Sequence, residues 1–253
     1  MVSAGAARAD DRTICKPDVL GSATVRAVID GRTLTLGDGR QLRLPGIEVP
    51  TDDGNDTAAR AALEQRVAGQ EVRLLRMGPD SDRYGRLLAG VATIDDGKPV
   101  QLELLAEGHA LVASTAANTG CGAVFLSAEK AARVSGLGLW KAANYAKINA
   151  EDPAGILAFR GRFAVVEGKV LSVRESGGTI YVNFGRRWSE DFTVTALKRN
   201  ERTFEAAGMP LKKLAGRLVR IRGTVEERGG PWIEAIHPGQ IEIVEQRWTT
   251  GGP

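Results

Sequence analysis

The chain has 253 residues, more than one small domain needs and enough for two. Hydrophobic residues make up 43% and charged residues 26%, as in ordinary globular proteins, so each domain can bury a core. Aromatic residues are only 5% while glycines number 31, a combination that favours turn-rich β structure over a helical bundle. The net charge of +3 permits a polyanionic partner without requiring one. No apolar run approaches the roughly 18 residues of a transmembrane helix, so no membrane span is predicted.

The N-terminal segment, residues 1–21, has no clear periodicity and is interpreted as a leader. The stretch Ala-Arg-Ala-Asp-Asp at 7–11 is typical of the end of a secretory signal. The chain has two cysteines, Cys15 and Cys121, and an even number of cysteines in an exported protein favours a disulfide; two unrelated buried thiols are the alternative. We therefore predict a periplasmic or secreted protein, in which a Cys15–Cys121 disulfide ties the N-terminal segment to a helix predicted over 124–134.

The first predicted unit spans residues 22–140. Asp-Gly at 30–31, between alternating apolar residues, is a strong hairpin signal. The predicted order is β-β-β-α-β-β-α-α, with strands at 23–29, 33–36 and 41–44, a helix at 56–67, strands at 71–77 and 86–94, and helices at 100–107 and 124–134.

A second β-rich unit is predicted over 161–246, after a linker at 141–160 and before a tail at 247–253. Its expected strands are 163–173, 179–184, 192–195, 217–226, 232–236 and 241–245, with a helix at 198–207. Short strands with one inserted helix are typical of a small Greek-key barrel of the oligonucleotide/oligosaccharide-binding (OB) type.

Four motifs of the first unit occur in a fixed order: VIDGRTL at 28–34, LRLPGIEVP at 42–50, DRYGRLL at 82–88 and GLW at 138–140. Together they resemble the staphylococcal nuclease (thermonuclease) family over residues 22–140. The resemblance implies a five-stranded OB-type barrel and a calcium-dependent phosphodiesterase. In that family two aspartates and a backbone carbonyl bind the ion, a glutamate activates water, and two arginines bind the phosphate. The expected fold class is thus β-rich, with two OB-type barrels, the first of staphylococcal-nuclease topology.

The metal positions of the family are altered in this chain. Arg32 stands at the first calcium aspartate, so the charge there is inverted, and Glu48 stands at the second. Val49 stands at the residue whose backbone carbonyl binds the ion. A change of side chain does not remove this carbonyl. A guanidinium about 4 Å from Ca²⁺ would repel it by several kcal/mol at intermediate dielectric. We therefore predict that Arg32 and Glu48 form an ion pair where the ion would lie, and that no metal is bound.

The general base is also replaced, because the glutamate position holds Thr51. A positioned base contributes on the order of 10²–10⁴ in rate, so its loss predicts little activity. Asp52 and Asp53 follow directly and could supply a relocated carboxylate, although Asp-Asp-Gly is more often a solvated turn.

The two phosphate arginines match Arg43 and Arg86. With Arg32 nearby they are the predicted phosphate-binding residues, because the guanidinium fork suits phosphate oxygens. The alternative is that they pair with carboxylates such as Glu48. Asp82 and Tyr84, in the loop before Arg86, also match the family.

Other candidate residues carry weaker signals. Arg186, Arg187 and Trp188 combine charge with an aromatic ring and are candidates for single-stranded nucleic acid; alternatively, Trp188 closes the core and the arginines face water. The surrounding unit resembles the OB-type module appended to some bacterial nuclease homologues. His109 is interpreted as a packed or capping residue and His237 as a turn residue, and neither lies near a cysteine in a metal-binding pattern.

The function that follows is a catalytically degenerate nuclease-like protein that binds nucleic acid, another polyanion or a protein partner in the cell envelope. No catalytic residue and no cofactor is assigned. One alternative is an active calcium-dependent nuclease with relocated carboxylates, which would require Ca²⁺. The other is a protein-interaction scaffold. The sequence leaves the enzymatic status, the physiological ligand and the oligomeric state open.

Overall fold

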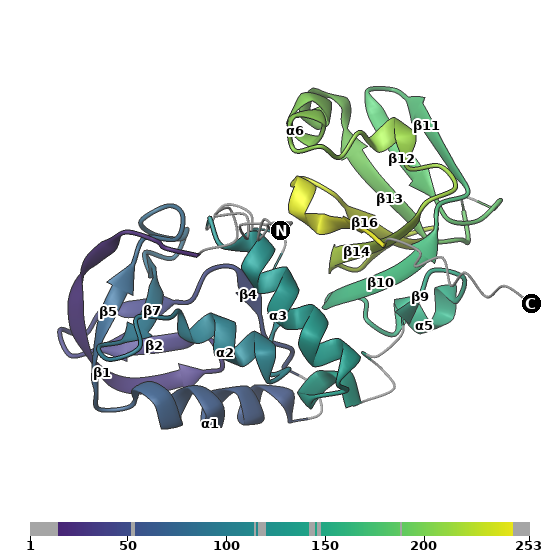
Figure 1. Cartoon of the computed structure of the whole chain (residues 1–253). Coiled ribbons are helices and arrows are strands. Elements are labelled where there is room, and N and C mark those ends of the chain that lie inside the picture. Colours follow the sequence, from purple (N-terminus) through teal and green to yellow (C-terminus); the bar gives the residue numbers. More distant parts are fainter. Residues whose placement is uncertain are drawn as a thin grey trace, which may run out of the picture.

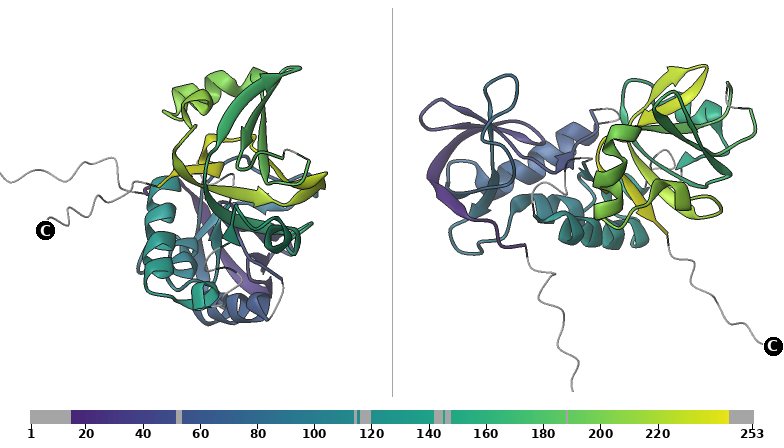
Figure 2. Two further views of the ribbon diagram at one scale, coloured as in Figure 1. Left: turned by 90° about the vertical axis from the view of Figure 1, so that its right-hand side faces the viewer. Right: turned by 90° about the horizontal axis from the view of Figure 1, so that it is seen from above.

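The protein is described from a computed structural model that covers residues 15–51, 54–113, 115, 120–141, 145, 148–187 and 189–244. Two β-rich units lie side by side, with the long helix α3 (Gly122–Val134) of the first unit facing the second (Figure 1). Seen from above, the two sheet systems remain separate, and α3, in teal, runs along the lower edge of the view where the two units meet (Figure 2, right). No helix of the described residues is long and apolar enough to cross a membrane.

The first unit is built on a curved six-stranded sheet in the order β6-β3-β2-β1-β5-β7. Its strands are β1 (Val19–Asp30), β2 (Thr33–Leu36), β3 (Gln41–Arg43), β5 (Glu71–Leu75), β6 (Leu87–Leu88) and β7 (Gly90–Thr93). The first half of β1 pairs with β5 and the second half with β2, so one long strand belongs to both sides of the curved sheet. The sheet and its helices are consistent with an OB-like fold of the staphylococcal-nuclease kind.

Two features of this sheet differ from the predicted elements. The strand predicted at 86–94 is divided, because β6 pairs parallel with β3 whereas β7 pairs antiparallel with β5. A short ladder between β4 (Ile47–Glu48) and β8 (Leu111–Val112) was not predicted. Strands of two residues have no readable periodicity, which explains why the sequence misses them.

Helices α1 (Asn55–Val67), α2 (Val100–Ala106) and α3 occur where helices are predicted, followed by the 3₁₀ turn η3 (Gly138–Lys141). In α1 the buried residues recur at helical spacing on one face: Ala59, Ala62, Leu63 and Val67. The predicted disulfide between Cys15 and Cys121 is present and joins the start of the described chain to the residue before α3.

The second unit contains a four-stranded sheet, β17-β14-β10-β9, and a five-stranded sheet, β11-β12-β13-β16-β15. Their bounds are β9 (Ile148–Asn149), β10 (Phe163–Lys169), β11 (Ser172–Ser176), β12 (Thr179–Asn183), β13 (Thr193–Leu197), β14 (Leu218–Thr224), β15 (Glu226–Arg228), β16 (Gly230–Glu234) and β17 (Ile241–Ile243). Short helices connect them: α5 (Pro153–Leu157), η4 (Lys198–Asn200), α6 (Glu201–Ala206), η5 (Leu211–Lys213) and η6 (Pro238–Gln240). The stretch 141–160, expected to be a linker, contains β9 and α5, and β9 pairs parallel with β10.

The hydrophobic core crosses from one unit to the other. The core cluster of the second unit also includes first-unit residues: Leu111, Ala132, Leu139 and Trp140. Beside it, Arg222 on β14 is fully buried and contacts Glu129 on α3, also fully buried, at 2.9 Å. The two units therefore share packed apolar and ionic contacts.

Candidate functional site

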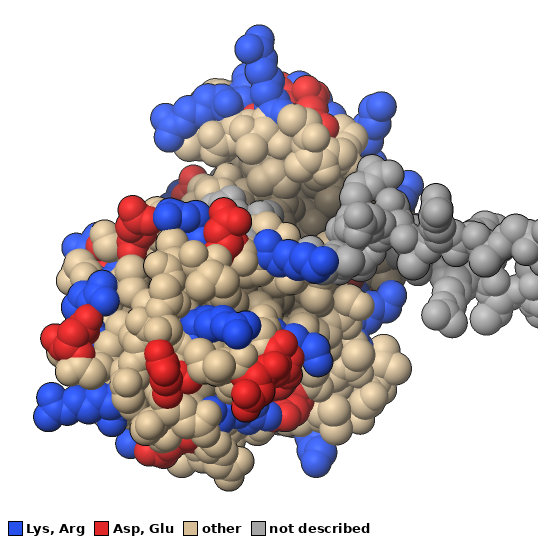
Figure 3. All heavy atoms as spheres, turned by 60° about the vertical axis from the view of Figure 1, so that its left-hand side comes forward, with Lys and Arg blue, Asp and Glu red and all other residues tan. Residues whose placement is uncertain are grey.

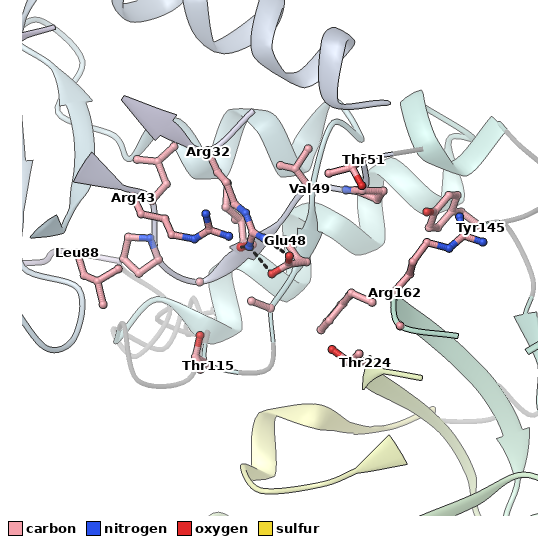
Figure 4. A pocket seen from close by; sticks show the side chains of 18 residues that line it. Arg32, Arg43, Glu48, Val49, Thr51, Leu88, Thr115, Tyr145, Arg162 and Thr224 are labelled. Carbon is pink, nitrogen blue, oxygen red and sulfur yellow. Dashed lines mark hydrogen bonds and ion pairs between the residues drawn. The ribbon is translucent and has the colours of Figure 1, made fainter. Parts of the chain in front are cut away.

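A cavity of about 470 Å³ lies where the two units meet (Figure 4). The first unit supplies the β3–β4 connection and the residues after β4, and the second supplies the start of β10 and the end of β14. The residues that line it are Arg32, Arg43, Leu44, Pro45, Gly46, Ile47, Glu48, Val49, Pro50, Thr51, Leu88, Ala113, Thr115, Tyr145, Gly161, Arg162, Phe163 and Thr224. The predicted site residues Arg32, Arg43, Glu48 and Thr51 thus share one cavity.

The tight turn between β1 and β2 places Arg32 in this cavity. The Asp30 carboxylate accepts the Arg32 backbone N–H at 2.8 Å, which fixes the turn. Gly31 packs closely against its neighbours, because a Cβ atom there would lie 2.7 Å from Ala59 Cβ and 2.8 Å from Val49 Cγ1. Any larger residue would push the turn outward and displace the arginine.

The predicted ion pair between Arg32 and Glu48 is present. Each terminal nitrogen of the Arg32 guanidinium donates to one oxygen of the Glu48 carboxylate, and Nη1 also donates to the Ile47 carbonyl at 3.1 Å. The side chains are 17% and 26% exposed. Figure 4 shows the pair at the centre of the cavity, with both bonds drawn. A bidentate pair of this kind is geometrically specific, and it satisfies a carboxylate that is partly removed from water.

These residues do not fit the calcium ion that the family resemblance implies. Calcium prefers several oxygen ligands, carboxylates above all. Among the described residues, Glu48 is the only carboxylate that lines the cavity; it already accepts from Arg32 with both oxygens, and a cation stands beside it. Among the described residues no cluster of three His, Cys, Asp or Glu side chains could hold a metal. Asp52 and Asp53, the candidates for relocated carboxylates, lie outside the described residues.

Arg43 extends from β3 toward the Arg32–Glu48 pair (Figure 4). Burial lowers the pKa of Arg43, and the nearby charges of Arg32 and Arg86 lower it further. Its hydrogen bond to the Thr33 hydroxyl is long, at 3.5 Å. Arginine stays protonated at neutral pH in proteins, so this guanidinium brings a weakly compensated positive charge to the cavity.

Arg86 is close enough to affect Arg43 but does not line the cavity. The turn before it allows a tight reversal because Gly85 has φ 77°. Asp82 accepts from Arg86 Nε at 2.7 Å and from the backbone N–H groups of Tyr84 and Arg86. Burial works against ionisation of Asp82, but these hydrogen bonds outweigh it and lower the pKa of the carboxyl. Of the alternatives for Arg86, pairing with a carboxylate is thus observed, though the partner is Asp82 and not Glu48.

The second unit contributes cavity residues that sequence reasoning missed: Tyr145, Gly161, Arg162, Phe163 and Thr224. Figure 4 shows Tyr145 and Arg162 together at the end of the cavity near Thr51. Arg162 donates to the Ala158 carbonyl, and its guanidinium lies 4.7 Å from the Phe159 ring centroid. No local pattern in the sequence marks these residues.

The other predicted residues that the structure describes do not line this cavity. Arg186 lines a different hollow on the second unit, Arg187 pairs with Glu190 at 2.8 Å, and Trp188 lies outside the described residues. His109 lies 3.7 Å from Glu107, and burial lowers its pKa. His237 caps η6, in agreement with its interpretation as a turn residue.

The protein is β-rich, and its first unit is consistent with an OB-like fold of the staphylococcal-nuclease kind. In a comparison with protein families, residues 41–142 match the family described as staphylococcal nuclease homologue. This stretch of the chain is therefore similar to a staphylococcal nuclease domain. A comparison with curated proteins gives no match.

Proposed function

We propose that the first unit is a catalytically degenerate nuclease-like domain that binds phosphate groups of a nucleic acid through Arg43, with Arg32 and Arg86 beside it. The observation that carries this proposal is the arrangement of cations around the cavity. Arg32 and Arg43 line it, and Arg86 is near enough to lower the pKa of Arg43. Guanidinium groups that converge in this way favour a phosphate ligand.

The same arrangement argues against efficient hydrolysis. Thr51 lines the cavity at the position of the family's base and has no basic group at neutral pH. A positioned base contributes on the order of 10²–10⁴ in rate. Arg32 supplies the positive charge beside Glu48 that a metal would otherwise supply, but it cannot bind and polarise a water molecule as a metal does.

The charge balance predicts weak binding whose affinity falls only modestly as salt rises. Arg32 is paired with Glu48 and Arg86 with Asp82, which leaves Arg43 as the least compensated of the three arginines. Few phosphate contacts give a small number of released counterions. Figure 3 shows acidic and basic side chains interspersed over the visible face of the first unit, so this face offers no broad basic surface to add affinity.

The proposal also includes an OB-type fold for the second unit and a periplasmic or secreted location for the protein. The parallel pairing of β13 with β16, combined with the long antiparallel β10–β14 ladder, supports an OB-type barrel for the second unit as well. The Cys15–Cys121 disulfide is compatible with a periplasmic or secreted location, because disulfides persist in oxidising compartments.

The binding test uses a 5′-phosphorylated dinucleotide titrated at low salt and followed by NMR of the full chain. We expect signals near Arg43 to shift, and Arg43→Ala/Arg86→Ala to abolish those shifts. Arg26→Ala/Arg60→Ala is the matched control, because it removes the same charge from exposed positions of the same unit. Affinity should fall as salt rises. Unchanged binding in the Arg43/Arg86 variant would contradict the proposal.

The proposed loss of catalysis is tested by digestion of DNA and RNA with Ca²⁺ or with EDTA. The assay compares the wild type with Arg32→Asp/Thr51→Glu. We expect no calcium-dependent digestion by the wild type. If the wild-type protein cleaves either substrate only with calcium, the active nuclease with relocated carboxylates is correct instead.

A further inference from the structure

The outer face of the five-stranded sheet of the second unit is hollowed into a groove of about 910 Å³, larger than the cavity between the units. Strands β11, β12, β13 and β16 form its floor. None of its lining residues belongs to the cavity between the units. We call this hollow the sheet groove; it is lined by Leu171, Ser172, Arg174, Ser176, Thr179, Tyr181, Asn183, Gly185, Arg186, Thr193, Thr195, Leu197, Arg228, Trp232 and Glu234.

The pleat of the sheet explains why polar side chains line the groove. On each strand, alternate residues point to opposite faces. The inward set is apolar and buried: Ile180, Val182, Val194, Ala196 and Ile233. The pairing register aligns the outward set into two rows across the strands, Arg174–Tyr181–Thr195–Glu234 and Ser172–Asn183–Thr193–Trp232.

The floor of the groove offers hydrogen-bonding groups that are weakly engaged. Asn183 and Thr193 are each 8% exposed, and Thr195 is 6% exposed. With the described residues the Asn183 amide makes only long contacts, donating to Ser172 Oγ at 3.4 Å and accepting from Thr193 Oγ1 at 3.5 Å. Amide and hydroxyl groups in such contacts can exchange them for the donors and acceptors of a ligand.

Arginines dominate the charge of the groove. Arg174, Arg186 and Arg228 line it, against the single acidic side chain of Glu234. Arg174 and Arg186 form no ion pair with any residue that the structure describes. The Arg228 guanidinium lies 3.4 Å from the centroid of the Trp232 ring, which holds this cation in place. The groove is therefore complementary to an anionic chain.

We propose that the sheet groove binds a single-stranded nucleic acid. The Tyr181 ring is the stacking platform for a base, and Arg174, Arg186 and Arg228 contact phosphates along the rim. Asn183 and Thr195 hydrogen-bond to the edges of the stacked bases. A single strand is favoured over a duplex because the bases of a duplex are stacked inside it and cannot reach an aromatic side chain on a sheet floor.

The test measures binding of a fluorescein-labelled oligo(dT) of about 12 nucleotides by fluorescence anisotropy, a length within the range for one such module. The full chain carries Arg43→Ala/Arg86→Ala throughout, so that the first unit does not contribute. In this background we expect Tyr181→Ala to weaken binding roughly five- to hundred-fold, as for loss of one stacked base. Tyr181→Phe should retain most of the affinity, because it keeps the ring.

The arginines are tested by salt dependence. Arg174→Ala/Arg186→Ala should reduce the slope of log K against log salt by about 1.4, since each of the two lost phosphate contacts to a single strand contributes about 0.7. Arg202→Ala, an exposed arginine on α6 outside the groove, is the control and should change neither affinity nor slope.

Three results would overturn the proposal: unaltered affinity in both the Tyr181→Ala and the Arg174/Arg186 variants, equal affinity for the matching duplex, or binding of an acidic oligosaccharide without binding of oligo(dT). Melting temperatures of all variants establish that each is folded.

Discussion

At the scale of a single residue, the Arg32 guanidinium supplies the positive charge beside Glu48. A carboxylate that is partly removed from water needs positive charge or hydrogen-bond donors nearby. Glu48 receives both from the Arg32 guanidinium, which is held by the Asp30–Gly31 turn and by the Ile47 carbonyl. The site is therefore electrostatically satisfied within the chain.

Calcium should accordingly leave the melting temperature of the wild-type protein unchanged, because a ligand stabilises a protein only by binding its folded form. An ion at 100 times its Kd would add about 2.7 kcal/mol. Arg32→Ala, by contrast, should lower the free energy of unfolding by about 1–2 kcal/mol, because Glu48 then loses its partner at a half-buried position. Differential scanning fluorimetry with Ca²⁺ and with EDTA measures both effects. A calcium-dependent rise in the wild type would show that the ion pair does not replace the metal.

At the scale of the elements, helix α3 contacts the N-terminal segment, the β4–β8 ladder and the second unit. Its N-terminal end follows Cys121, which is bonded to Cys15, 106 residues earlier in the chain. Its middle carries Glu129, which accepts the Val112 N–H of β8 at 2.6 Å. The helix thus fixes the N-terminal segment on one side and the short β4–β8 ladder, next to the cavity, on the other.

Removal of the disulfide by Cys15→Ala/Cys121→Ala should destabilise the protein by about 2–5 kcal/mol, since the unfolded chain is then released from a long closed loop. Urea denaturation of the oxidised wild type and of the variant gives the difference. Reduction of the wild type by dithiothreitol should move its midpoint toward that of the variant and should leave the variant unchanged. Identical midpoints for oxidised and reduced wild type would mean that the disulfide does not contribute to stability.

At the scale of the whole molecule, a buried ionic cluster joins the two units. Arg222 Nη1 lies 2.9 Å from Glu129 and donates to the Val112 carbonyl at 3.1 Å, while Nη2 lies 3.3 Å from Glu242. Arg133 also contacts Glu129, at 3.1 Å. The cavity of the proposed phosphate site has walls from both units, and this cluster is one of the contacts that hold the units together.

Arg222→Met should destabilise the protein by about 3 kcal/mol, because Glu129 is left charged and buried. The loss stays at the low end of the range for buried pairs, since Arg133 and the Val112 N–H still contact the carboxylate. Arg222→Met/Glu129→Gln should recover at least half of this loss, because the amide is uncharged yet still accepts the Val112 N–H. Chemical denaturation of both variants is the measurement. Equal stability of the single variant and the wild type would mean that the cluster does not hold the units together.

The sequence alone predicted the features that depend on local interactions, and those for which it offers few possible partners. Asp-Gly at 30–31 predicted the hairpin that positions Arg32, and the inverted charge at Arg32 predicted its pairing with Glu48. Two cysteines allowed a single disulfide. Helices α1, α2 and α3 followed from apolar spacing and from the glycines that end them.

Only the tertiary structure placed the second unit against the first. Arg222 occupies a strand position where a charged residue ordinarily faces water, yet it is fully buried against residues 93 and 110 positions away. The same packing of the two units brings three further residues to the cavity: Tyr145, Arg162 and Thr224. The pairing of Arg86 with Asp82 in place of Glu48 was likewise decided by the turn geometry. Spacing along a chain encodes which face of an element is apolar, but contacts between distant elements depend on how those faces pack, which no local pattern records.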